Sequence, residues 1–175
     1  MSDMKAITDQ RSRPRVLLRE LNAIAAALIL VVTTIVVVRW AFPGIYASGP
    51  MAFVTTYVGA AWPFFAAVGI FIFYVTGAWL MDIFGMAASR NWTNISEGLH
   101  WATEACPLVG LLTTFLSLLL ALLTYGEAGP GQPETQAAFI TQFAIAFGSS
   151  IAGGILALIA FTLHRLLPED GGENA

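Results

Sequence analysis

The sequence predicts an all-α integral membrane protein with four transmembrane helices, short loops and both termini in the cytoplasm. Of its 175 residues, 57% are hydrophobic and only 11% are charged, whereas a soluble domain carries about a quarter charged residues. The mean hydropathy is +0.74, and four apolar segments each reach the roughly 20 residues that a spanning helix needs. This composition excludes an ordinary soluble domain, and nothing in it indicates nucleic-acid binding.

The four apolar segments are the predicted spans of a membrane domain over 21–165. They cover about 21–42, 52–85, 107–125 and 140–163. The second is longer than a span requires, so we expect it to tilt or to project into the aqueous phase, and Pro63 in its first half can kink it. Runs of β-branched residues such as Val31–Thr34 have weak helix propensity, but in lipid the need to satisfy every backbone hydrogen bond overrides it.

The distribution of basic residues predicts the orientation. The polar N-terminal segment 1–20 contains Lys5, Arg11, Arg13, Arg15 and Arg19. The predicted outer loops, 43–50 and 126–136, contain no Lys or Arg. Because short cytoplasmic segments carry an excess of Lys and Arg, both the N-terminal segment and the acidic tail 166–175 are expected in the cytoplasm.

The segment between the second and third spans, 88–105, mixes aromatic and aliphatic side chains with polar ones. Trp92, Ile95, Leu99 and Trp101 are its large apolar residues. This pattern predicts a short amphipathic helix that lies at the membrane interface.

Ionisable groups are absent from the middles of the third and fourth spans. A self-contained proton transporter keeps such a group at depth, so conduction would require another chain to bring the charge. The single cysteine, Cys106, cannot form an internal disulfide, and His100 and His164 lack the sequence spacing of metal ligands. No nucleophile–base pair or paired carboxylate lies at a shared depth. We therefore expect no enzymatic activity, no cofactor and no metal.

Small and hydroxyl-bearing side chains form one stripe on each of the last two spans. At helical spacing the third span aligns Gly110, Thr114, Ser117 and Ala121, and the fourth aligns Ala146, Ser150, Gly153, Ala157 and Ala160. Such stripes commonly allow helices to approach closely in lipid, which is the role we assign to Gly110, Ala146, Gly153 and Ala157. The hydroxyls are alternatively a functional face, with five candidate channel-lining residues: Thr113, Thr114, Ser117, Ser149 and Ser150.

The two stripes lie in motifs that resemble the MotA/TolQ/ExbB proton-channel family. PLVGLLTTFLS, from Pro107 to Ser117, is similar to the third-span signature P-x-x-G-L/I-L/I-G-T-V/F-x-G, with Thr113 and Ser117 where glycine is usual. AFGSSIAGGILALIA, from residue 146 to 160, is similar to A-L-x-x-T-x-x-G-L/V-x-x-A-x-x-A, with Ser150 in place of threonine.

The resemblance implies a pore subunit of the bacterial inner membrane. In that family a homo-oligomeric ring, typically of five copies, surrounds two helices of a single-span MotB/TolR/ExbD-like partner, which carries a membrane-embedded Asp. Thr114 and Ser150 would then face that Asp. Four spans with both termini inside resemble the flagellar-stator branch. Stator members, however, have a large cytoplasmic domain where this chain has only the segment 86–104.

The resemblance therefore implies a compact relative that couples proton or other cation flow to some mechanical or envelope process other than turning a flagellum. The alternative is a four-span structural or accessory subunit of a larger membrane complex that conducts no ions. In that case the hydroxyl stripes serve only to pack one helix against another.

Overall fold

The computed structural model describes residues 2–41, 58–85, 91–128 and 133–167. Its elements are α1 (Ser2–Ala41), the 3-10 turn η2 (Gly59–Ala61), α3 (Trp62–Ile83), α4 (Thr93–Ala128) and α5 (Pro133–Leu166). The four α-helices are each long and apolar enough to span a membrane. The predicted fold class, an all-α protein with four membrane-spanning helices, is confirmed.

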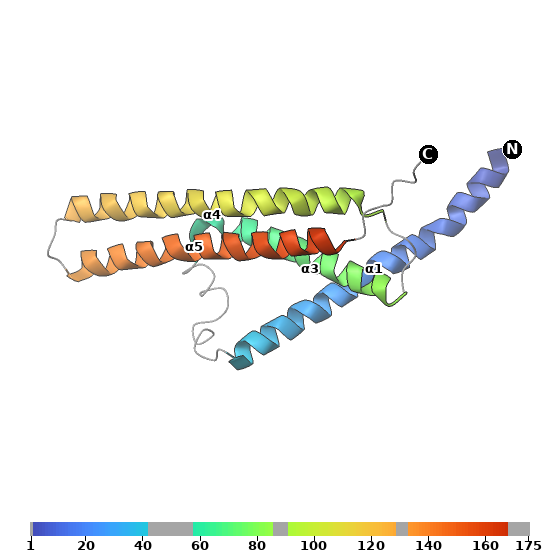
Figure 1. Cartoon of the computed structure of the whole chain (residues 1–175), viewed down its shortest axis with the longest axis horizontal. Coiled ribbons are helices and arrows are strands. Elements are labelled where there is room, and N and C mark those ends of the chain that lie inside the picture. The colour runs from blue at the N-terminus through green and yellow to red at the C-terminus, as the bar shows by residue number, and fades with distance from the viewer. Residues whose placement is uncertain (1, 42–57, 86–90, 129–132, 168–175) are drawn as a thin grey trace.

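The helices alternate in direction along the chain. α4 and α5 form a long antiparallel hairpin, α3 lies beside the hairpin, and α1 crosses α3 obliquely and then diverges (Figure 1). Among the described elements α1 packs against α3 alone. The first residues of α1 and the last residues of α5 lie at the same end of the molecule (Figure 1), as four successive membrane crossings require.

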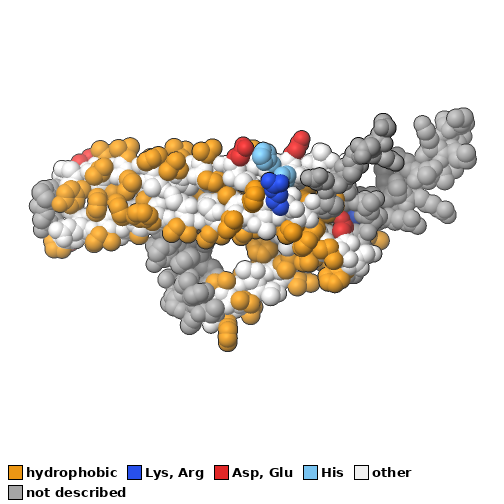
Figure 2. Space-filling model, viewed as in Figure 1, with side chains coloured by type: hydrophobic (Ala, Val, Ile, Leu, Met, Phe, Trp, Pro, Cys, Tyr) orange, Lys and Arg blue, Asp and Glu red, His pale blue; other side chains and the backbone are white. Residues whose placement is uncertain are grey.

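Apolar side chains cover the outside of the α4–α5 hairpin, and its charged and histidine side chains lie toward the two ends (Figure 2). Exposed leucines and phenylalanines such as Leu112, Phe115 and Phe147 are 56–68% exposed. Exposing such an apolar surface to water would be thermodynamically unfavourable, whereas contact with the hydrocarbon core of a membrane is not. The fold is therefore that of a multi-pass membrane protein.

α4 is longer than the span predicted from hydropathy. The short interfacial helix predicted over 88–105 is, from Thr93 onward, continuous with the third span, and Pro107 lies inside the helix. One buried face runs through this junction, because Leu99, Cys106, Thr113 and Ala121 are all buried. Proline has no N–H to donate, so the helix loses one backbone hydrogen bond at Pro107. Burial of one continuous stripe on both sides of Pro107 offsets the free-energy cost of that loss.

The two hairpin helices are too long to be contained in a bilayer. α4 has 36 residues and α5 has 34. At about 1.5 Å per residue each exceeds 50 Å, against a hydrocarbon core of about 30 Å. They extend into the predicted outer loop 126–136, of which residues 129–132, between the two helices, lie outside the described residues. The other predicted outer loop, 43–50, and the tail from 168 also lie outside them.

α3 begins and ends at residues suited to helix termini. Pro63 occupies the first turn, where its missing N–H is not needed, so the kink expected there does not arise. At the other end the Phe84 N–H donates to Leu80 O, and Gly85, with φ +66°, donates to Asp82 O. Glycine takes this left-handed conformation without steric cost. Residues 52–57 of the predicted second span lie outside the described residues.

The crossing of α1 and α3 depends on Gly77. A Cβ atom there would lie 2.8 Å from the Ala27 nitrogen and 2.9 Å from the Ala23 carbonyl oxygen, both backbone atoms. We expect Gly77→Val to push α1 away from α3 and to lower stability by about 1–3 kcal/mol, measured as the thermal-unfolding midpoint in mild detergent. Gly69→Val is the matched control, because a Cβ on Gly69 meets nothing within 4 Å. Equal midpoints for the two variants would contradict the crossing.

Candidate functional site

α4 and α5 approach each other closely through glycine. A Cβ atom on Gly110 would lie 2.9 Å from the Ser149 carbonyl oxygen, and one on Gly153 would overlap the carbonyl oxygen of Cys106. Gly110, Ala146, Gly153 and Ala157, the residues predicted to pack helices, are all buried. Because no side chain separates the two backbones at the glycines, short polar side chains on either helix can reach the other helix.

Two hydroxyls from different helices meet at this close approach. The Thr114 Oγ1 and Ser150 Oγ atoms are 2.6 Å apart. Thr114 Oγ1 also lies 2.8 Å from the Ala146 carbonyl oxygen and 2.9 Å from that of Gly110. One consistent arrangement has the Ser150 hydroxyl donating to Thr114, which in turn donates to Ala146. Both side chains are partly exposed, so this hydrogen-bonded pair forms a polar site at the surface of the hairpin.

The other three candidate hydroxyls lie deeper. Ser149 is fully buried and donates to the Ala146 carbonyl at 2.9 Å. Thr113 is 8% exposed and donates to Val109 O of its own helix at 2.8 Å, and Ser117 is 6% exposed. Of the five predicted channel-lining residues, Thr114 and Ser150 are thus the two that keep appreciable exposed surface in the described chain, and any contact with a partner's side chain would have to be made there.

The described residues offer little other ionisable chemistry at depth. No three His, Cys, Asp or Glu side chains come together in the described part of the chain as a metal site would require. Asp82, near the end of α3, has one carboxylate oxygen that is buried and lacks a hydrogen-bond partner.

The fold brings together two histidines that lie far apart in the sequence, His100 and His164. The ring centroids of His100 and His164 lie 5.8 Å apart. The Ser96 hydroxyl lies 2.9 Å from His164 Nδ1, and His100 Nε2 lies 3.4 Å from a Glu104 carboxylate oxygen. A signal was present: His100 precedes Thr114 by as many residues as His164 follows Ser150, so one antiparallel register aligns both pairs.

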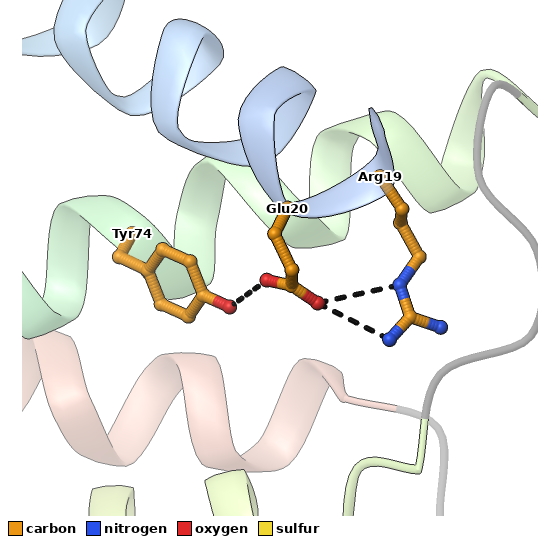
Figure 3. Close-up of polar contacts among 3 residues, drawn as sticks. All are labelled: Arg19, Glu20 and Tyr74. Atoms are coloured by element: carbon orange, nitrogen blue, oxygen red, sulfur yellow. Dashed lines mark hydrogen bonds and ion pairs between the residues drawn. The ribbon is translucent and has the colours of Figure 1, made fainter. Parts of the chain in front are cut away.

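A second polar contact missed from the sequence joins α1 to α3. The Tyr74 hydroxyl donates to the Glu20 carboxylate, which also accepts from Arg19 (Figure 3). Glu20 and Tyr74 come from helices that cross obliquely, so no single helical period relates them and no pattern in the sequence indicates the contact.

Comparison with known proteins finds no match, whether against protein-family models, curated proteins or solved structures. The fold defines the class: a four-span helical membrane protein. In the described part of the chain, the Thr114–Ser150 pair is a polar contact that joins two of these spans.

Proposed function

We propose that this protein is the multi-span subunit of a channel for protons or another cation, working with a single-span partner that carries an Asp within the membrane. The Thr114–Ser150 pair is the observation on which the proposal rests. Two hydroxyls from neighbouring spans converge within 2.6 Å on helices whose middles contain no charged residue. Both remain partly exposed, so a side chain from another subunit can approach them.

The chemistry of hydroxyls suits this role. A carboxylate in the membrane is costly, and its protonation removes that cost. Each hydroxyl can donate to the charged carboxylate or accept from the neutral acid, and neither holds the proton as a fixed base would. While no partner is bound, the Thr114 hydroxyl can donate to the carbonyl oxygen of Gly110 or Ala146. It can therefore switch between these carbonyls and the partner's acid without leaving a buried polar group unpaired.

The assembly is proposed on the same basis. A ring of several copies, five by resemblance to the MotA/TolQ/ExbB family, would enclose the partner's helices in the bacterial inner membrane and couple ion flow to mechanical or envelope work. The N-terminal segment and the tail would lie in the cytoplasm. The brevity of the connection between α3 and α4 is compatible with a compact complex.

A specific observation favours the second candidate, a four-span structural or accessory subunit. Thr114 and Ser150 bond to each other and Thr114 bonds to carbonyls of both helices, which is what helix packing alone requires. In that case the hydroxyls have no role beyond holding α4 against α5.

The two candidates are separated by purification and reconstitution. The chain is purified from its native host in mild detergent, co-purifying single-span proteins are identified, and the complex is placed in liposomes that contain a pH-sensitive dye. We expect proton uptake when a membrane potential is imposed, and loss of that uptake when the partner's membrane Asp is changed to Asn. A chain that purifies without such a partner and conducts nothing would establish the structural candidate instead.

A further inference from the structure

An apolar groove lies between α1 and α3 where the two helices diverge. It has a volume of about 600 Å³, and its lining includes Ile24, Leu28, Val31, Ala67, Phe71 and Tyr74. The groove exists because Gly77 holds the helices together at one point, against Ala23 and Ala27, while α1 leans away from the rest of the bundle beyond it (Figure 1).

A polar group adjoins this groove. Tyr74 lines it, and the Tyr74 hydroxyl lies 2.5 Å from Glu20 Oε2. On the other side of the carboxylate, Arg19 Nη2 lies 3.1 Å from Glu20 Oε1 (Figure 3). The side chains of Arg19 and Glu20 are 21% and 33% exposed, so a ligand's polar atoms can reach both.

The groove and the polar group beside it together span about one lipid leaflet. The candidate span of α1 begins at Leu17, which places Arg19 and Glu20 in its first turn, at the level of lipid headgroups. The groove's lining on α1 then continues from Ile24 to Val31, and at about 1.5 Å per residue Val31 lies about 16 Å along the axis from Glu20. Half of the hydrocarbon core is about 15 Å. An acyl chain that starts beside Glu20 would therefore follow the groove to the middle of the membrane.

We propose that this groove is a binding site for one phospholipid with an ethanolamine headgroup. The phosphate accepts hydrogen bonds from Arg19, the ammonium donates to Glu20, and one acyl chain fills the groove between α1 and α3. Arg19 supplies a donor for a phosphate and Glu20 an acceptor for an ammonium, which are the two charged groups of a zwitterionic headgroup. A choline headgroup has no N–H to donate to the carboxylate, so the site distinguishes the two zwitterionic lipids. The inference does not depend on ion conduction.

Lipid retention tests the groove. The full chain is purified in mild detergent, and bound lipid is counted by phosphorus analysis and mass spectrometry. We expect about one phosphatidylethanolamine per chain. Ala67→Phe fills the groove and should lower retention about tenfold, as loss of the acyl-chain contacts implies. Ala66→Phe is the control, because Ala66 is exposed and does not line the groove. If Ala67→Phe does not fold, Ile70→Trp replaces it, since Ile70 lines the groove and is 70% exposed.

Headgroup choice tests the polar end. The protein is equilibrated with vesicles of equal phosphatidylethanolamine, phosphatidylcholine and phosphatidylglycerol, and the bound lipid is analysed. We expect enrichment of phosphatidylethanolamine, and loss of that enrichment in Glu20→Gln with the total bound lipid retained. Bound lipid that mirrors the vesicle composition in the unmodified protein would overturn the proposal. So would equal retention by the two alanine variants, or cross-linking that places a helix of a second copy in the groove.

Discussion

Replacing Gly153 by leucine is expected to separate α4 from α5 and to leave little folded protein. A Cβ atom at this position would overlap the Cys106 carbonyl oxygen and would lie 3.2 Å from the Cys106 carbonyl carbon and 3.4 Å from Gly110 Cα. All three are backbone atoms, which cannot rotate away as a side chain can. Overpacking of a core costs about 1–3 kcal/mol and occasionally more, and a clash between two backbones belongs at the upper end. The measurement is resistance to unfolding in mild detergent.

The adjacent glycine provides a matched control. A Cβ on Gly154 meets nothing within 4 Å, yet Gly154→Leu makes the same chemical change one residue away on the same helix. Removing a glycine from a helix interior favours the helix by about 0.5–1 kcal/mol, so this variant should be as stable as the unmodified protein or slightly more so. Similar losses for both variants would show that the close approach at Gly153 does not hold the hairpin together.

If the protein is the channel subunit proposed above, replacing Thr114 by valine is expected to lower ion flux about tenfold or more in the complex reconstituted with its partner, while the complex still assembles. Valine has nearly the shape of threonine but cannot bond to Ser150 or to the Ala146 carbonyl. A hydrogen bond to a charged group is worth about 1.5–3 kcal/mol, and each 1.36 kcal/mol is tenfold in rate. Proton uptake by liposomes at a fixed membrane potential measures the effect.

Two other threonines of the hairpin serve as controls for this change. Thr141 and Thr162 are exposed, and their hydroxyls donate to Ala137 O and Leu158 O of their own helix. Thr141→Val and Thr162→Val should leave flux unchanged. Normal flux in Thr114→Val would count against a pore at this site. Hydrogen bonds between membrane helices contribute about 0.6 kcal/mol on average and at most about 1.7 kcal/mol. A loss of stability of this size without a selective flux defect would favour the structural candidate.

Hydropathy located the four spans because lipid imposes a simple rule: a long apolar segment must form a helix to satisfy its own backbone. The same rule does not say where a helix ends once it leaves the membrane. The segment 88–105 looked like a separate interfacial helix because its composition changes at Pro107. In the structure its apolar residues Trp92 and Leu99 are buried on the same face that α4 continues to bury further along. Packing, not composition, decides that continuity.

The sequence by itself determined the class of protein, the number of spans and the small and hydroxyl residues of the third and fourth spans, because these follow from hydropathy and helical period. Only the tertiary structure decided that the Thr114 and Ser150 hydroxyls meet, that His100 lies beside His164, and that α1 touches the bundle at Gly77 and then diverges. Each of these depends on the register and crossing angle between helices. The register and crossing angle depend on which helix surfaces can approach each other to van der Waals distance. This is a property of a pair of helices and cannot be read from the sequence of either helix alone.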